Sequence, residues 1–200
     1  FILWPQSFRS APLDAFMLLM TWLGTHYFYI AFIPVLYWSI SKRWGVLAAL
    51  ALSTSIYLGE FIKWSLKLPR PTSPPVQILR PEPSPGFVST HAAPAVAVWG
   101  TLAFCIRRWW FTLLALFMIA SISLSRPYLG VHFPADVVGG WLVGVLALGF
   151  VLKVVPWLEP RLQKWTVKRQ VAAALVLGGA LLVIFPSDWD GHRPVSYPPL

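Results

Sequence analysis

The stretch "WWFTLLALFMIASISLSRPYLGVHFPADVVGGWLVGVLALGFVLKVV" (109–155) places two long apolar runs on either side of a short polar segment. The runs, 109–125 and 135–155, each approach the length of about 20 residues that a helix needs to cross a hydrocarbon core. Because hydrocarbon offers no partner to backbone N–H and C=O groups, we expect such runs to be helical. The stretch therefore predicts two transmembrane helices joined by the polar turn "SRPYLGVHFPAD" (125–136).

The rest of the chain repeats this pattern. Of its 200 residues, 57% are hydrophobic and 12% are charged, whereas soluble domains carry about 25% charged residues. Strands of a transmembrane barrel would be about ten residues long and would alternate in polarity, which these runs do not. We expect an all-α polytopic membrane helix bundle, a single domain over 1–200, with about six transmembrane helices. They are predicted at 25–41, 44–63, 88–106, 109–125, 135–155 and 168–186.

The segment "LDAFMLLMTWLG" (13–24) precedes the first run and is too short to cross a membrane alone. We interpret it as an interfacial helix that ends at Gly24. The alternative is one long tilted helix over 13–40, kinked at Pro34. No positively charged leader with a small-residue cleavage site is evident. The chain does not begin with Met, which leaves room for an upstream span.

Lys and Arg fall in two sets of loops on opposite sides of the predicted bundle. The first set holds nine: Lys42, Arg43, Arg107, Arg108, Lys153, Arg161, Lys164, Lys168 and Arg169. The second holds seven: Arg9, Lys63, Lys67, Arg70, Arg80, Arg126 and Arg193. Three of the seven, Lys63, Arg70 and Arg126, belong to the motifs described below, and without them the count is nine against four. The positive-inside rule then predicts that the first set is cytoplasmic and that both termini and the segment 125–136 are extracytoplasmic.

The net charge of +9 suits a protein that contacts anionic lipid headgroups. Because the cations are expected at a membrane surface, we expect no nucleic-acid partner. Cys105 is the single cysteine, so an intramolecular disulfide is excluded.

A first polar cluster closes the second run in "KWSLKLPRP" (63–71). Lys63 and Arg70 are seven residues apart, about two helical turns, and so share one face. Like charges on one stripe repel unless an anion lies between them, which points to an anion site. Lys67 is on the same stripe and is interpreted as a cation that marks the membrane boundary. Glu60, one turn earlier, is expected to pair with a lysine.

A second cluster opens the third run in "PGFVSTHAA" (85–93). The N-terminus of a helix presents free N–H groups and attracts anions. Ser89 or Thr90 is suited to cap this helix. Capping explains the hydroxyl groups but leaves His91, at the membrane edge, without an explanation.

The third cluster is the polar turn quoted at the start. Pro134 is suited to the first turn of the next helix, which brings His132 and Asp136, four residues apart, face to face. A carboxylate on one ring nitrogen fixes the tautomer and frees the other nitrogen to react. The alternative is that Asp136 caps the helix and His132 fills space.

The predicted topology puts all three clusters on one side of the bundle, so their side chains can meet. Three cations, helix-end N–H groups and a hydroxyl suit a tetrahedral oxyanion, for which Arg has a bidentate geometry. Two histidines are left for a nucleophile and a general acid. Because the chain has only seven acidic residues, no carboxylate-rich metal site is expected, and the clusters predict phosphoryl transfer without a metal or another cofactor. The residues are Lys63, Arg70, Ser89, His91, Arg126, His132 and Asp136.

These motifs resemble the three-part signature of the type 2 phosphatidic acid phosphatase superfamily, which includes membrane lipid phosphatases and, more remotely, vanadium haloperoxidases. The matching residues are Lys63-x6-Arg70-Pro71, Ser89-Thr90-His91 and Ser125-Arg126-x5-His132-x3-Asp136. The middle part usually reads Pro-Ser-Gly-His and here reads Val-Ser-Thr-His. Sphingosine-phosphate phosphatases also use Ser-Thr-His, and "RPTSPPV" (70–76) is similar to their first motif. The signature spans 63–136, and the resemblance extends over about 14–155.

The resemblance implies phosphate-binding roles for Lys63, Arg70, Ser89, Thr90 and Arg126. It also implies that His132 attacks phosphorus to form a phosphohistidine while Asp136 orients its ring. His91 would protonate the leaving oxygen and then activate water. Because His132 must start neutral and His91 protonated, we expect a bell-shaped pH–rate profile.

The sequence therefore predicts an integral-membrane lipid phosphate phosphatase. A lipid phosphotransferase that uses the same phosphohistidine is the main alternative, and a non-catalytic lipid-binding or transport protein is a third. A haloperoxidase would need vanadate and is normally soluble. The lipid is left open among phosphatidic acid, phosphatidylglycerol phosphate, polyprenyl diphosphate and sphingoid phosphates, and so is the oligomeric state.

Three further features lie close to these motifs or beyond them. His26 is interpreted as structural, with lining the opening to the site as its alternative role, and His192 is given no role. Gly139, Gly140 and Gly144 are expected to let a neighbouring helix or an acyl chain approach closely.

Overall fold

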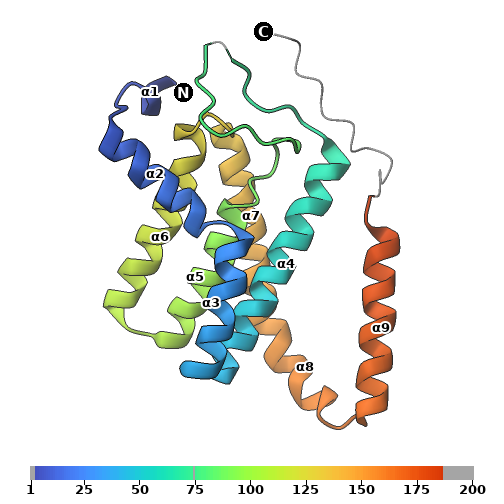
Figure 1. Cartoon of the computed structure of the whole chain (residues 1–200). Coiled ribbons are helices and arrows are strands. Elements are labelled where there is room, and N and C mark those ends of the chain that lie inside the picture. The colour runs from blue at the N-terminus through green and yellow to red at the C-terminus, as the bar shows by residue number, and fades with distance from the viewer. Residues whose placement is uncertain (1–2, 74, 187–200) are drawn as a thin grey trace.

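The computed structural model describes residues 3–73 and 75–186, whose regular secondary structure consists of helices without a strand (Figure 1). The prediction of an all-α protein is thereby confirmed. The elements are α1 (Leu3–Gln6), α2 (Ala11–Leu23), α3 (His26–Ser39), α4 (Lys42–Leu66), α5 (Ala92–Ile106), α6 (Trp109–Tyr128), α7 (Pro134–Gly149), the π-helical turn η1 (Phe150–Val154), α8 (Val155–Leu162) and α9 (Val167–Ile184). His192 and Arg193 lie outside the described residues.

Helix α5 is the centre of the bundle and packs against α4, α6 and α7. Its first eight residues are all buried, and six of them are Ala or Val. Helix α7 meets it closely through glycines. A Cβ on Gly140 would lie 2.7 Å from the carbonyl oxygen of Ser89, and one on Gly144 would lie 2.6 Å from that of Ala93. The expected close approach of a neighbouring helix at these glycines is therefore present.

Four described segments are long and apolar enough to cross a membrane, and they are α4, α6, the continuous stretch Pro134–Leu162 and α9. Helices α2 and α3 pass the same test only as a pair, bent by 61°, which raises the number to five. The predicted run 88–106 falls short because its helix begins only at Ala92 and has 15 residues. An integral membrane bundle is thus confirmed, whereas the number six is not reached by these criteria.

The N-terminal region forms two helices whose break falls between Gly24 and Thr25, not at Pro34. The hydroxyl of Thr25 accepts a hydrogen bond from the Phe28 N–H at 3.4 Å and so caps α3. Pro34 lies inside α3. The single helix over 13–40 is therefore not what forms, and the separate helix expected at 13–24 is α2.

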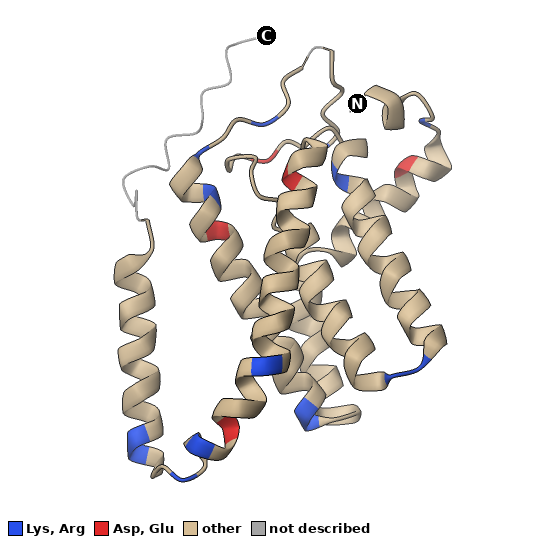
Figure 2. Ribbon diagram, turned by 180° about the vertical axis from the view of Figure 1, so that it is seen from behind, with Lys and Arg blue, Asp and Glu red and all other residues tan. Residues whose placement is uncertain are grey.

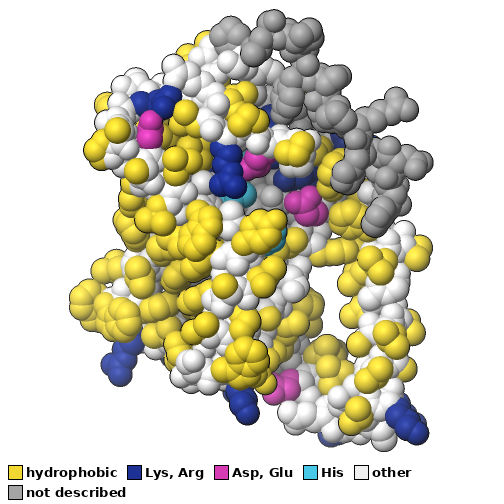
Figure 3. Space-filling view, viewed as in Figure 1, with side chains coloured by type: hydrophobic (Ala, Val, Ile, Leu, Met, Phe, Trp, Pro, Cys, Tyr) yellow, Lys and Arg dark blue, Asp and Glu magenta, His cyan; other side chains and the backbone are white. Residues whose placement is uncertain are grey.

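Lys and Arg gather toward the two ends of the bundle (Figure 2). We call the end where α4 and α6 finish and α5 and α7 start the site end, and the opposite end, with the α3–α4, α5–α6 and α8–α9 connections, the far end. Hydrophobic side chains cover much of the surface between the two ends (Figure 3). Helix α9 stands beside α4 (Figure 1), where the Tyr57 hydroxyl donates to the Leu181 carbonyl at 2.8 Å.

Candidate active site

The structure brings the eight residues singled out from the sequence to the site end. Lys63 is in the last turn of α4, Arg126 in the last turn of α6 and Asp136 in the first turn of α7. The other five lie in connections: Arg70, Ser89, Thr90 and His91 between α4 and α5, and His132 between α6 and α7. All but Thr90 and His91 are buried, and Arg126 and His132 are 0% exposed.

Asp136 both caps α7 and contacts His132, the two roles that the sequence analysis gave as alternatives. Its Oδ2 accepts a hydrogen bond from the Phe133 N–H at 2.8 Å and so caps α7. The same oxygen lies 3.3 Å from Nδ1 of His132. Capping and orienting the histidine are therefore not alternatives.

The tautomer of His132 follows from its two neighbours. Nη1 of Arg70 lies 3.2 Å from Nε2 of His132. A guanidinium can only donate, so Nε2 is the acceptor and Nδ1 carries the proton that faces Asp136. Burial, followed by the charges of Arg126, Arg70 and Lys63, lowers the pKa of His132 well below its usual value. The ring is therefore neutral, with a lone pair on Nε2 directed toward the cations.

Polar groups hold each of the three buried cations, and most of these groups come from other elements of the chain. Nζ of Lys63 lies 3.1 Å from Oγ1 of Thr90 and 3.7 Å from the Glu60 carboxylate, so the expected pairing of Glu60 with a lysine is confirmed. Arg70 donates from Nη1 to the Val131 carbonyl at 2.7 Å. Lys67 is exposed, at the C-cap of α4.

Arg126 crosses from α6 to the N-terminal region, where its Nη1 donates to Oγ1 of Thr21 in α2. Its Nη2 donates to Oε1 of Glu82. Its Nε is buried without a hydrogen-bond partner. The guanidinium is thus fixed at one edge while it keeps an unused donor.

Ser89 and His91 stand where α5 begins. The N-cap residue of α5 is His91, and the Ser89 hydroxyl, two residues earlier, accepts a hydrogen bond from the Ala92 N–H at 3.3 Å. The Ser89 N–H donates to the Asp136 carbonyl at 2.9 Å and so ties the second motif to the third. Nδ1 of His91 is buried without a partner. Burial, and then the charges of Arg126 and Lys63, lower the pKa of His91 well below its usual value.

Sequence reasoning missed three residues of this cluster: Thr21, Glu82 and Ser84. Oε2 of Glu82 lies 2.9 Å from Nη2 of Arg70, and Oγ of Ser84 lies 3.0 Å from the same nitrogen. Burial alone would raise the pKa of Glu82, but the charges of Arg126 and Arg70 prevail and lower it. The scarcity of acidic residues was a signal for Glu82, because buried cations need counter-ions. Nothing in the sequence pattern marked Thr21.

The arrangement suits a tetrahedral anion more than a metal ion. Within the described ranges no group of three or more His, Cys, Asp and Glu side chains is placed to hold a metal. The cluster instead holds three buried cations, of which Arg70 contacts the neutral imidazole of His132. The second histidine, His91, has a nitrogen without a hydrogen-bond partner. Such a cluster can bind a phosphate group and present a nucleophile to it. His26 is exposed, and its ring centroid lies 4.0 Å from that of Tyr27.

Curated relatives carry phosphatase names. Lipid phosphate phosphatase delta of Arabidopsis thaliana is 29% identical over 210 residues, which cover 96% of this chain and 49% of the relative. Sphingosine-1-phosphate phosphatase 2 of Homo sapiens is 36% identical over 138 residues, covering 63% of this chain and 34% of the relative. The chain thus spans half or less of the length of these two proteins.

A solved structure and a family model also match this chain. The crystal structure of Aquifex aeolicus LpxE superposes with a TM-score of 0.71 at 25% identity, over 76% of this chain and 92% of that one. The model of the PAP2 superfamily matches residues 44–160, a range that holds all three motifs. The chain, as its motifs indicated, belongs to the PAP2 superfamily.

Proposed function

We propose that this chain is an integral-membrane lipid phosphate phosphatase that works through a phosphohistidine and needs no metal. The observation that carries the proposal is the setting of His132. Its Nδ1 is backed by Asp136 at 3.3 Å, and its Nε2 faces Arg70 at 3.2 Å. The relatives named for lipid phosphate and sphingosine-1-phosphate support the same class of substrate.

In the first step Nε2 of His132 attacks phosphorus. The N–P bond forms as the bond from phosphorus to the lipid oxygen breaks, and Asp136 stabilises the positive charge that the ring acquires. Lys63, Arg70 and Arg126 hold the non-bridging oxygens and stabilise the charge that grows on them in the transition state. Ser89 and Thr90 complete the phosphate site from the start of α5.

His91 acts first as a general acid and then as a general base. It donates a proton to the departing lipid oxygen, then takes one from the water that attacks phosphohistidine and releases inorganic phosphate. In the free chain burial and the nearby cations lower the pKa of His91, which disfavours the protonated acid. A bound phosphate dianion neutralises those cations and raises the pKa again, so substrate binding itself prepares the acid.

The proposal includes the arrangement in the membrane. The nine Lys and Arg of the first set are all exposed at the far end or near it, which supports a cytoplasmic far end and an extracytoplasmic site. Helix α5, buried among α4, α6 and α7, would be the additional span that brings the number to six. A headgroup at the outer interface then meets the site while its tails stay in hydrocarbon.

The test is the release of inorganic phosphate from a panel of lipids by the purified chain in detergent, with EDTA present. The panel holds phosphatidic acid, phosphatidylglycerol phosphate, a polyprenyl diphosphate and a sphingoid phosphate. We expect release from at least one lipid at a rate that EDTA does not change. No release from any lipid, or release abolished by EDTA, would contradict the proposal. Release that depends on an added acceptor alcohol would favour a phosphotransferase.

A further inference from the structure

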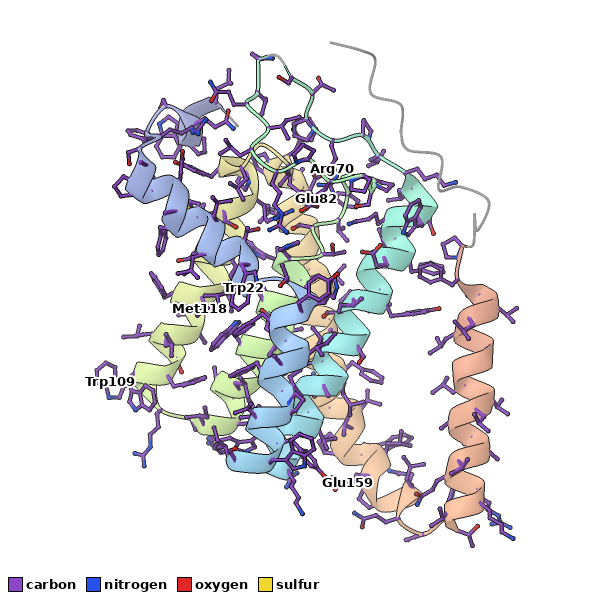
Figure 4. All side chains as sticks on the ribbon, in the orientation of Figure 1. Trp22, Arg70, Glu82, Trp109, Met118 and Glu159 are labelled. Carbon is purple, nitrogen blue, oxygen red and sulfur yellow. The ribbon has the colours of Figure 1, made fainter. Side chains whose placement is uncertain are left out.

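The segment 82–84 (Glu-Pro-Ser) lies across the three cations of the candidate site. The two carboxylate oxygens of Glu82 engage one arginine each: Oε2 lies 2.9 Å from Nη2 of Arg70, and Oε1 accepts from Nη2 of Arg126. The Ser84 hydroxyl lies 3.0 Å from Nη2 of Arg70 and 3.4 Å from Nζ of Lys63. Figure 4 shows Arg70 and Glu82 next to each other at the site end.

These contacts are those that a phosphate group would make. The Glu82 carboxylate is shared by two guanidinium groups, and the Ser84 hydroxyl lies between one of them and an ammonium group. These oxygens accept from the same N–H donors that the oxygens of a tetrahedral oxyanion would use. The Glu82 side chain is 21% exposed, so it reaches the solvent side of the cluster, whereas the side chain of Arg126 is 0% exposed. The Glu82 carboxylate thus lies between solvent and the cations, and its lowered pKa keeps it ionised.

The arginines have other contacts that hold them when Glu82 leaves. Arg126 donates to Thr21 in α2, and Arg70 donates to the carbonyl of Val131 at 2.7 Å. The donors on the cations can therefore stay in place for a different anion. A phosphate and the Glu82 carboxylate would repel each other on the same donors, so one excludes the other.

The backbone around Glu82 is suited to such a movement. The Leu79 N–H donates to the Leu129 carbonyl at 3.1 Å, and the Gly86 N–H donates to the Leu68 carbonyl at 2.7 Å. Between these two anchors three prolines, at 81, 83 and 85, have no N–H to donate. A shift of 80–85 therefore breaks few backbone hydrogen bonds, while the anchors keep the rest of the connection in place.

We propose that Glu82, supported by Ser84, is an internal competitor for the oxyanion site, which a phosphate group must displace before it can bind. Glu82 would thereby set the affinity for the phosphate of the substrate and for inorganic phosphate as product. This inference rests on the proposed function, since it takes the three cations to be the phosphate site. A carboxylate that served only as a structural counter-ion would stay in place, and its removal would not tighten anion binding.

The test measures the binding of orthovanadate and of inorganic phosphate to the full chain in detergent by calorimetry. Glu82→Gln keeps the shape of the side chain and removes its charge. We expect it to lower the Kd of both anions about tenfold or more, because the competitor is lost. The matched control is Glu159→Gln, an exposed carboxylate of α8 at the far end, labelled in Figure 4, whose replacement should leave both Kd values unchanged.

An unchanged or raised Kd in Glu82→Gln, with anion binding to the wild-type chain intact, would overturn the inference and leave the proposed function standing. No anion binding by the wild-type chain, together with no phosphate release from any lipid, would overturn both. If Glu82→Gln does not fold without an anion, we expect added phosphate to restore folding. If phosphate does not restore folding, the test uses Ser84→Ala instead. We expect this variant to lower the Kd of both anions about two- to threefold. An unchanged Kd would count against the inference.

Discussion

The two ends of the bundle use Lys and Arg in opposite ways. At the far end and near it, nine of these residues are exposed, eight of them in or beside the α3–α4, α5–α6 and α8–α9 connections and one, Lys153, in η1. At the site end Lys63 is 1% exposed, Arg126 0% and Arg70 8%. The same residue types thus meet water or lipid headgroups at the far end, whereas at the site end three of them are buried in protein.

The difference shows which cations carry a specific role. Removing a charge from water costs several kcal/mol unless partners replace the lost hydration. At the site end those partners come from segments far apart in sequence, Thr21 in α2 and Glu82 before α5 among them. Exposed cations need no such partners and report topology. Buried ones indicate a site built around an anion.

The largest predicted effect on activity is the one that distinguishes a buried histidine beside the cations from an exposed one. His132→Ala should lower the rate of phosphate release by at least about 10³-fold, because the attacking nitrogen is removed. His26→Ala is the matched control, since His26 is exposed and lies against Tyr27, and it should keep most of the activity. A His132→Ala protein that releases phosphate at a rate close to wild type would rule out the phosphohistidine mechanism.

A smaller effect is expected for arginines. Arg126→Met keeps much of the side-chain volume but removes the charge, and should lower kcat/KM about 10²- to 10³-fold. Arg108→Met removes an exposed arginine at the far end and should change kcat/KM less than about twofold. Thermal melting of both variants controls for folding. Equal losses in the two variants would remove the functional distinction between the ends.

The smallest expected effect is a displacement between two pH profiles. The pKa values of both His132 and His91 are lowered by burial first and by the buried cations second. A lowered pKa keeps His132 neutral, so the acidic limb of kcat/KM should lie below about pH 6.5. His91 must be protonated to act as the acid. Because its pKa is lowered in the free chain, kcat/KM should fall as the pH rises above that pKa. Bound phosphate raises that pKa, so the basic limb of kcat should lie at a higher pH than that of kcat/KM.

Rates measured from about pH 4 to about pH 9 check this prediction, with His91→Gln as the variant in which the basic limb should disappear. A wild-type rate that rises steadily across the whole range would contradict the assignment of His91 as the acid.

Much of the fold was predictable because hydrocarbon leaves the chain few options. The runs predicted at 109–125 and 168–186 are α6 and α9, with ends displaced by at most three residues. The run at 88–106 begins as a helix only at Ala92, since 89–91 turn into the site instead of continuing the helix. The hydropathy pattern includes Val88 in the apolar run and contains no signal for the turn at 89–91.

The three motifs were predictable because their residues recur at helix ends on one side, and the structure brings them together. The need of buried cations for a counter-ion was a signal for Glu82, but its position beside the arginines was not predictable, because the connection 69–85 has no periodic pattern from which a fold-back can be inferred. Thr21 was not, because its contact with Arg126 depends on the direction of α2 after the 61° bend. Both contacts are tertiary, and both satisfy a charge whose burial becomes apparent only when the helices are packed.

One carboxylate oxygen of Asp136 both caps α7 and faces His132. Fraying of the first turn of α7 would therefore also release His132, the proposed nucleophile, from its alignment. Helix ends open at lower free energy than packed interiors such as that of α5. On heating, we therefore expect the proposed activity to be lost while the helices are still formed, so that the temperature range of activity is narrower than that of the folded state.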